Sequence, residues 1–356
     1  MASYEKVGDT WTVRYREYLP DGSVKNARKS GFARKRDAQD YFESIKDRVK
    51  KRNEQINSPA HIPFEEMVSV YLEYKRGRMK ESSVYTVEGK ISKHIMPSFA
   101  GKYFDEITKQ DILAWQESLS GLSYSYKSGL RATLVSIYKY AARYRDAINM
   151  IDCVEPFRNT DAPKEMMFWS REQFEDFISA VDDPMYRLLF KTLYITGCRK
   201  GEVFALTWAD FDPSAGTLNV NKSITRKVQG AKYAVTSPKN TSSIRTVDIP
   251  PSLVEALASY RQDRPADATY IFGDYRPLPE QTVTRAFNIW IAKAGVPRIR
   301  IHDLRHSCAS LLISEGISIV AVSHRLGHKN IEQTLNTYSH MMPRDNEKML
   351  AALNGI

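Results

Sequence analysis

Residues 11 to 18, WTVRYREY, alternate large apolar or aromatic side chains with charged ones. A period of two predicts a strand with one covered face. Pro20, Asp21 and Gly22 supply a turn signal before a second extended stretch. From Ala33 the period becomes helical, and one face carries Ala38, Phe42 and Ile45. The first 55 residues are therefore expected to form a small sheet with one helix.

Four stretches in the middle of the chain repeat apolar positions at helical spacing. They are residues 64–74, 83–95, 109–119 and 124–144. The last stretch carries a stripe that is expected to pack a core. Its members are Leu130, Leu134, Ile137, Tyr138 and Ala141. Polar segments with prolines flank this region, so we expect domains at 1–55, 64–147 and 166–356, joined by linkers at 56–63 and 148–165.

The third region mixes helices with short strands. Ser170 is a good N-cap and Gln173 completes a capping box, which opens a helix to Val181. A second helix is expected over 184–196, and helices also dominate the end of the chain. Extended segments are expected at 217–225, 233–236 and 245–249. The predicted fold class is multidomain α+β: a small N-terminal sheet-plus-helix domain, an all-helical domain, and a mainly helical domain with a small antiparallel sheet.

The charge balance points to a polyanionic partner. The chain has 52 Lys and Arg against 42 Asp and Glu, a net charge of +10, while 42% hydrophobic residues predict a folded protein. Positions 1–52 alone carry 14 basic against 8 acidic side chains. A sheet with a basic open face can lie in a DNA major groove. It can equally be a solvated basic surface, and composition leaves both interpretations open.

Cysteine usage and hydropathy indicate the cellular compartment. Cys153, Cys198 and Cys308 are widely spaced and form no zinc pattern, which suits a reducing cytosol. The start of the chain has no apolar segment of signal-peptide length, and no run approaches the ~18 apolar residues of a membrane span. We expect a soluble cytoplasmic protein without a membrane partner, a metal or a cofactor.

Two patterns in the C-terminal half carry chemistry. The first is TGCRKGEVFALTW (196–208), in which Gly197 can end one helix and Arg199 begins the next beside Glu202. The second runs from IHDLRHSCASLLISEG (301–316) to HRLGHKNIEQTLNTYSH (324–340). Five of the seven histidines lie at or after His302, which is too dense to be structural throughout.

Helical spacing makes the second pattern more specific. His302 and Arg305 are three residues apart and share a face. Gly327 can end a short helix just before His328, and Tyr338 follows ten residues later. The expected buried stripe of the first helix is Ala309, Leu312 and Ile313.

This inventory suits phosphodiester cleavage. An oxygen nucleophile that attacks phosphorus builds negative charge on the non-bridging oxygens, and forked guanidiniums with histidine donors neutralise that charge. Tyrosine can be the covalent nucleophile, because a phenol with a pKa near 10 leaves far more readily than an alkoxide. The covalent intermediate would therefore be reversible without a metal.

The four motifs resemble those of the tyrosine recombinase family. TGCRKGE is similar to its first arginine motif, HDLRH to its His-x-x-Arg motif, LGH to its later histidine and TLNTYSH to its nucleophile segment. Order and spacing agree as well. The chain is similar to the three-domain integrases of temperate phages and integrative conjugative elements.

The resemblance implies a role for each motif residue. Arg199, Arg305 and His328 would bind the scissile phosphate, and Tyr338 would be the nucleophile. His302 would assist proton transfer from Tyr338 or orient the phosphate. An acidic position that braces the arginines matches Glu202.

The family also places a lysine on a β-hairpin as general acid for the departing 5′ oxygen. SPKNTSSIRTVDIP (237–250) is similar to that hairpin and points to Lys239. Asn240 stands where the family often has threonine, so Lys232 is the second candidate.

The resemblance further implies an activity and its partners. The expected enzyme integrates and excises a mobile element such as a prophage through a 3′-phosphotyrosyl intermediate. Residues 1–55 resemble an arm-type DNA-binding domain, a three-stranded sheet plus helix. Residues 64–147 resemble the SAM-like core-binding domain, and 166–356 the catalytic domain. Partners would be double-stranded DNA with core-type and arm-type sites and a homotetramer, with room for an excisionase and a host DNA-bending protein.

Simpler interpretations stand beside these. Arg199 and Arg305 could be salt-bridged to Glu202 and Asp303, although their motif context favours catalysis. Other residues are interpreted as packing or hydrogen-bonding (His306, His324), core (Cys198, Cys308) or peripheral (His340). The C-terminal segment 344–356 could dock on a neighbouring subunit or on its own domain. A type IB topoisomerase and a DNA-binding regulator that does not cleave are the alternative functions.

Overall fold

The computed structural model describes residues 2–18, 24–56, 59–161, 166–228, 230–237, 244–328 and 330–338, together with residues 350, 353 and 354. Two compact units divide the chain, Met1–Ala162 and Pro163–Ile356. The turn expected at Pro20–Gly22 and most of segment 344–356 lie outside the described residues.

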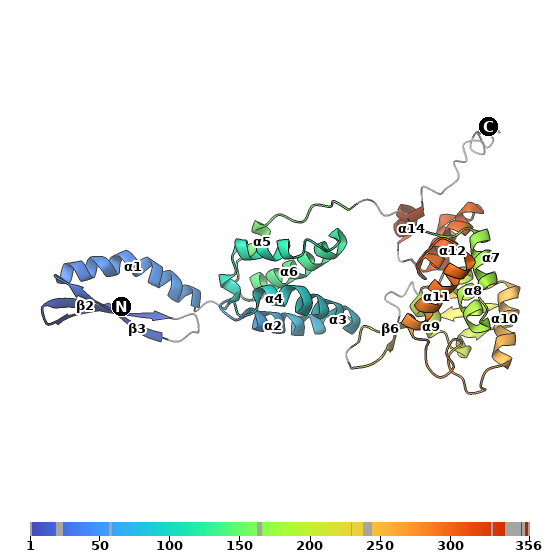
Figure 1. Cartoon of the computed structure of the whole chain (residues 1–356), viewed down its shortest axis with the longest axis horizontal. Helices are drawn as coiled ribbons and strands as arrows, with labels where there is room; N and C mark the ends of the chain where they lie inside the picture. The colour runs from blue at the N-terminus through green and yellow to red at the C-terminus, as the bar shows by residue number, and fades with distance from the viewer. Residues whose placement is uncertain are drawn as a thin grey trace. The chain divides into compact units, whose positions relative to one another are not determined.

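The N-terminal residues form an antiparallel sheet in the order β1-β2-β3, with one helix packed on it (Figure 1). The elements are β1 (Ala2–Val7), β2 (Thr10–Tyr18), β3 (Val24–Phe32) and α1 (Lys35–Ile56). Val13 and Ala38 are fully buried, and the rings of Tyr15 and Phe42 lie 5.6 Å apart. The predicted helical face is thus confirmed, as is the alternation from Val13 to Arg16, whereas Thr12 is also buried at a β-bulge. β1 supplies the third strand that the resemblance implied.

The rest of the first unit is a helical bundle. Its elements are α2 (Phe64–Arg76), α3 (Glu81–Lys90), η1 (Ile91–Ile95), α4 (Met96–Phe99), η2 (Phe104–Glu106), α5 (Lys109–Ser118), α6 (Tyr124–Tyr144) and η3 (Met150–Cys153). The helix expected over 83–95 is an α-helix that continues into the π-helical turn η1. Every member of the predicted stripe of α6 is fully buried.

Parts of both segments predicted as linkers pack against this bundle. Nδ1 of His61 lies 3.0 Å from the Asp105 carboxylate. Beyond α6, Ile151 and Val154 are buried, and their carbonyls accept hydrogen bonds from Arg131. Isolated buried residues of this kind create no periodicity, which is why the sequence pattern did not reveal them.

The second unit is mainly helical. Its helices are α7 (Arg171–Ala180), α8 (Pro184–Thr196), α9 (Lys200–Ala205), η4 (Trp208–Asp210), α10 (Pro251–Gln262), α11 (Glu280–Ala294), α12 (Asp303–Ser314), α13 (Ile319–Leu326) and α14 (Ile331–Tyr338). The predicted capping box of α7 is present, since the Ser170 side chain accepts from the Gln173 backbone and Gln173 reciprocates. The main core is rich in aromatic rings, among them Trp169, Phe177 and Phe287, which meet in tilted and edge-on contacts.

Two small antiparallel sheets complete this unit. One has the order β4-β5-β8 and the other pairs β6 with β7. The strands are β4 (Phe211–Asp212), β5 (Thr217–Val220), β6 (Ser223–Thr225), β7 (Ala234–Thr236) and β8 (Arg245–Asp248). The extended segment expected at 217–225 is therefore two strands in different sheets. The predicted fold class as a whole is confirmed.

A second, smaller core joins α12, α13 and α14. It consists of Ala309, Ile313, Val322, Leu326 and Tyr338, with Leu312 and Met166 packed at its edge. The stripe predicted for the first of these helices therefore faces this core. Among the described helices, none combines the length and apolar content needed to cross a membrane.

Candidate functional site

The first arginine motif forms a sharp turn between two helices. Gly197 ends α8 in the left-handed conformation, with φ 62°, as its position predicts. Arg199 precedes α9 and bonds Glu202 twice: its backbone N–H donates to Oε2 at 2.9 Å and Nη1 donates to Oε1 at 2.8 Å. The Arg199 side chain remains 38% exposed, so its guanidinium is accessible to a ligand.

Arg305 is the buried arginine of the site. Only 4% of it is exposed, and Nη1 donates to the carbonyls of Gly197 and Leu326, each at 2.8 Å. Asp303 instead pairs with Arg300, with 2.7 Å between Nη2 and Oδ1, so the proposed Arg305–Asp303 salt bridge is wrong. Burial lowers the pKa of Arg305 to about 10, which leaves it protonated at neutral pH.

One atom of Arg305 stands out. Its Nη2 is buried and has no hydrogen-bond partner among the described residues. A buried polar atom without a partner costs stability unless a ligand completes it. The atom is therefore a candidate donor for an anion once a movement of the surrounding residues opens it.

Three arginine side chains are hydrogen-bonded to the C-terminal end of α13. Three consecutive carbonyls there each accept a hydrogen bond from a different guanidinium. The pairs are Arg325 O with Arg245 Nε at 2.8 Å, Leu326 O with Arg305 Nη1 at 2.8 Å and Gly327 O with Arg199 Nη2 at 3.4 Å. A helix C-terminus carries partial negative charge, so it stabilises this concentration of cations.

His328 follows directly after the helix end. Gly327 caps α13 in the left-handed conformation, as predicted, and Nδ1 of His328 lies 2.7 Å from Oγ1 of Thr334. Burial and then the charges of Arg305 and Arg199 lower the pKa of His328 to about 4. The imidazole is therefore neutral at pH 7, and its Nε2 is a hydrogen-bond donor or acceptor for a ligand, depending on the tautomer.

His302 lies at the N-terminus of α12 and lines a pocket of about 250 Å³ together with Arg199, Lys200 and Arg226. Partial burial of its ring, with the charges of His306 and Arg305, lowers the pKa of His302 to about 4. The structure thus brings the first arginine and this histidine to one basic pocket.

Tyr338 is the last residue of α14 and is only 1% exposed. Its hydroxyl lies 2.6 Å from Nδ1 of His306. Burial raises the pKa of Tyr338 above its ordinary value, although the charge of Arg305 opposes that effect. Among the described contacts, His306 rather than His302 meets this hydroxyl, so His306 is hydrogen-bonding as predicted.

The remaining predicted residues have mixed outcomes. Lys239 and His340 lie outside the described residues, and Lys232 is exposed on the connection between β6 and β7. Cys198 and Cys308 are buried free thiols, as predicted. His324 is exposed, because α13 turns Val322 and Leu326 inward, so its interpretation as a packing or hydrogen-bonding residue is not confirmed.

Two residues of the site were missed from the sequence. Arg245 lies in the segment that resembles the lysine hairpin, but strand periodicity does not indicate which partner an arginine will meet. Thr334 precedes Tyr338 by four residues and is fully buried, which places both on the inner face of α14. The i, i+4 spacing was the available signal for Thr334.

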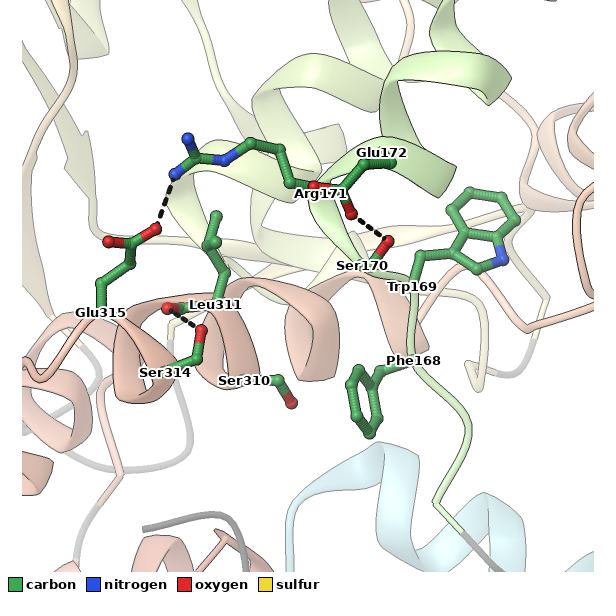
Figure 2. Close-up of a pocket in the computed structure, with 9 residues that line it drawn as sticks. All are labelled: Phe168, Trp169, Ser170, Arg171, Glu172, Ser310, Leu311, Ser314 and Glu315. Atoms are coloured by element: carbon green, nitrogen blue, oxygen red, sulfur yellow. Dashed lines mark hydrogen bonds and ion pairs between the residues drawn. The ribbon is translucent and has the colours of Figure 1, made fainter. Parts of the chain in front are cut away.

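Another pocket, of about 310 Å³, opens between α12 and the start of α7 (Figure 2). Arg171 and Glu315 face each other across it at 3.0 Å, and Ser170 donates to Glu172 at 2.7 Å. Arg171 and Glu315 are thus paired with each other, Glu172 accepts from Ser170, and none of the lining residues is a predicted site residue. None of the residues that line this pocket is one of the arginines at the end of α13.

Comparisons with known proteins agree with this geometry. The ICEBs1 integrase of Bacillus subtilis is 29% identical over 86% of this chain and 86% of its own length. The putative prophage phiRv2 integrase of Mycobacterium tuberculosis is 26% identical over 94% of this chain and 90% of its own length.

Solved structures share the fold. The Tn1549 transposon integrase in complex with a circular intermediate DNA superposes with a TM-score of 0.65 at 19% identity, over 80% of this chain and 98% of that one. A λ integrase tetramer bound to a Holliday junction gives a TM-score of 0.59 at 18% identity, over 92% and 94%. At these identities the likeness concerns the fold alone.

The family match covers both units. Residues 63–120 match the N-terminal SAM-like domain of phage integrases, and residues 168–344 match the phage integrase family. The second range contains every predicted catalytic residue from Arg199 to Tyr338, and together the two ranges span more than half of the chain. The chain belongs to the phage integrase family, that is, to the tyrosine recombinases.

Proposed function

We propose that this chain is an integrase that cleaves and rejoins DNA at specific sites through a 3′-phosphotyrosyl intermediate, and so integrates and excises a mobile element. The observation that carries the proposal is the unpartnered, buried Nη2 of Arg305. It belongs to a cluster with Arg199 and His328 at the end of α13, and Tyr338 shares the small core beneath that cluster.

The cluster fits a scissile phosphate. Arg305 supplies a fixed, desolvated guanidinium, and Arg199 supplies an accessible one that Glu202 holds in place. Neutral His328 adds a donor through Nε2 when Nδ1 accepts from Thr334. Preorganised donors of this kind stabilise the extra negative charge of the transition state.

The proposed chemical step is a transesterification. The oxygen of Tyr338 forms a bond to phosphorus while the bond from phosphorus to the 5′ oxygen breaks. The phenol loses its proton, for which His302 and its near neighbour His306 are the candidate acceptors, and the 5′ oxygen gains one from Lys239. Rejoining is the same step in reverse with a new 5′ hydroxyl.

Tyr338 must move before it can act. At 1% exposure its hydroxyl cannot contact a duplex, so the described conformation is a resting state in which α14 holds the nucleophile in the core. DNA binding would shift this short helix and present the tyrosine. That movement must break the hydrogen bond to His306 and withdraw the ring from the small core of α12, α13 and α14.

DNA and a tetramer are the proposed partners. Two structural neighbours are integrases bound to DNA, one of them a tetramer on a Holliday junction. We assign residues 64–147 to core-type sites, residues 1–55 to arm-type sites and residues 166–356 to catalysis, with an excisionase and a host DNA-bending protein as further partners in the bacterial cytoplasm. Binding two site types at once would combine modest affinities into a tight complex.

A suicide substrate tests the activity. The attachment site is found by sequencing the DNA next to the gene for a repeat shared with the host chromosome. A nicked duplex of that site should trap a covalent adduct with the wild-type protein and none with Tyr338→Phe. If both proteins bind the site and neither forms an adduct, the chain is a binding protein. Relaxation of a plasmid that lacks the site would favour the topoisomerase alternative.

A further inference from the structure

We infer that Arg245 is a positioning residue of the recombinase reaction: it fixes Arg199 through Glu202, and it fixes His328 through the end of α13. The inference rests on the proposed function. Arg245 begins β8 and lies about 80 residues from the helix end that it contacts. Its role is therefore a long-range one that no local motif would reveal.

The contacts of Arg245 join three separate segments of the chain. Nε donates to the carbonyl of Arg325 at 2.8 Å, and Nη2 lies 3.1 Å from both Glu202 Oε2 and Cys198 Sγ. These partners belong to the end of α13, to the turn before Arg199 and to α9, which follows it. One guanidinium thus sets the distance between two elements that each present a phosphate-binding side chain.

The fit around Arg245 is tight. A Cβ added to Gly327 would lie 3.1 Å from Nη1 and 3.2 Å from Cζ, closer than nearly all real contacts. Gly327 directly precedes His328. The guanidinium therefore occupies the space beside the Gly327 backbone that a side chain there would need.

Charge gives Arg245 a second influence on the site. Glu202 is 3% exposed and forms ion pairs with both Arg199 and Arg245. Burial alone would raise the pKa of Glu202, but Arg245 first and Arg199 after it hold the pKa below its ordinary value. Without Arg245, the carboxylate would lose its more buried partner and would hold the Arg199 guanidinium in a different geometry.

Arg245 does not act by touching DNA. Its side chain is only 8% exposed, against 38% for Arg199, and the contacts that the structure describes for it are with Arg325, Cys198 and Glu202. It is therefore expected to influence the chemical step and to leave DNA affinity nearly unchanged. This separation distinguishes a positioning residue from a phosphate-binding one.

The experiment uses the full chain and the suicide substrate described above. Arg245→Ala should lower the single-turnover cleavage rate at saturating DNA by ~100-fold, the scale of a misplacement of about 1 Å. Its Kd for the same DNA should change by less than about threefold. The cleavage rate of Arg245→Lys should lie between those of the wild-type protein and Arg245→Ala, because an ammonium can reach one acceptor but cannot bridge Glu202 and the Arg325 carbonyl.

Chemical rescue separates positioning from folding. Guanidinium at millimolar concentration should restore cleavage by Arg245→Ala at least ~10-fold by occupying the vacated site, while sodium at equal ionic strength should not. Arg187→Ala is the matched control, since that arginine also donates to a backbone carbonyl, Val181 O at 2.9 Å, elsewhere in the same unit. Guanidinium should not alter cleavage by the control.

Several outcomes would overturn the inference. They are an unchanged cleavage rate in folded Arg245→Ala, a parallel loss of DNA binding, or cleavage that guanidinium does not restore although thermal unfolding shows a folded protein. If Arg245→Ala does not fold, Arg245→Lys decides: cleavage and affinity that fall together contradict positioning. Failure of the wild-type protein to form an adduct would refute the proposed function, a result distinct from all of these.

Discussion

The hydroxyl of Tyr338 lies 2.6 Å from Nδ1 of His306, the residue that follows the buried Arg305 on α12. The proposed nucleophile and the proposed phosphate anchor are thus connected to adjacent positions of one helix. His306 also has its pKa lowered, first by burial, so it is neutral at pH 7 and can accept the phenol proton in a hydrogen bond. The resting position of the tyrosine therefore depends on a neutral imidazole.

Tyr338 should resist chemical modification in the absence of DNA. Nitration followed by mass spectrometry should modify Tyr85, which is 44% exposed, well before Tyr338, which is 1% exposed. His306→Ala should speed nitration of Tyr338 about fivefold, the equivalent of losing one hydrogen bond of ~1 kcal/mol, and should leave Tyr85 unchanged. Equal rates at Tyr85 and Tyr338 in the wild-type protein would contradict a buried resting state.

Thr334 should matter for cleavage through His328. Thr334→Val preserves the side-chain shape but removes the partner 2.7 Å from Nδ1 of His328, so the imidazole loses its fixed orientation. We expect stability to fall by ~1–3 kcal/mol and single-turnover cleavage to fall between ~10- and ~100-fold. DNA affinity should change little.

The control for this change is Thr192→Val. Thr192 is also fully buried, and its hydroxyl donates to a carbonyl of its own helix, Leu188 O at 2.8 Å. A similar loss of stability with normal cleavage is expected. Equal losses of cleavage in both variants would show that Thr334 acts only through stability.

His328 should make the second unit, Pro163–Ile356, less stable in acid. The pKa of His328 is lowered in the folded protein to about 4 from an ordinary value near 6.5. Between these two pH values the unfolded chain binds a proton at this ring that the folded chain does not bind. The stabilising effect of the neutral ring is complete above about pH 6.5 and is lost as the pH falls towards 4. At most ~3 kcal/mol is involved, because each pKa unit corresponds to about 1.4 kcal/mol.

The contribution is measured as a difference. Chemical unfolding of the wild-type protein and of His328→Gln, followed from pH 7.5 to 4.5, should show a shallower decline in the variant. NMR titration of the His328 ring provides a direct value. A ring that titrates at its ordinary pKa would contradict the burial and the nearby arginine charges.

What the sequence revealed was mostly local. Gly197 and Gly327 could be predicted as helix ends, and Ser170 as a cap, because each acts within a few residues of itself. The buried apolar stripe of α6 could be predicted for the same reason. The motif spacing likewise predicted which residues the fold would gather, and Arg199, Arg305 and His328 do meet at the end of α13.

The contacts that were missed are long-range. The Arg245–Arg325 bond joins residues 80 positions apart, and the His306–Tyr338 bond joins residues 32 apart. Neither sequence separation corresponds to the period of a helix or a strand, so hydrophobic periodicity could not predict these contacts. Asp303 was likewise an attractive partner for Arg305 by sequence proximity, yet it pairs with Arg300 because the backbone turn before α12 brings those two together.

The Arg245 guanidinium occupies the space that a Cβ at position 327 would need, which leads to a final prediction. In Gly327→Ala the alanine would have to adopt the left-handed backbone conformation of Gly327, at φ +70°. Its methyl group would also lie only 3.1 Å from Nη1 of Arg245. Gly316→Ala is the matched control, since Gly316 also follows a helix, has φ +80°, and has open space where its Cβ would lie. Both variants should lose ~1–2 kcal/mol from the backbone strain.

Only Gly327→Ala should also lose cleavage activity, since only its methyl group displaces Arg245 and the backbone that precedes His328. Single-turnover rates on the suicide substrate, compared at a temperature where both variants are folded, measure the difference. Equal cleavage by the two variants would mean that the Arg245 guanidinium can shift without disturbing the site, and the link between Arg245 and His328 would then have no catalytic consequence.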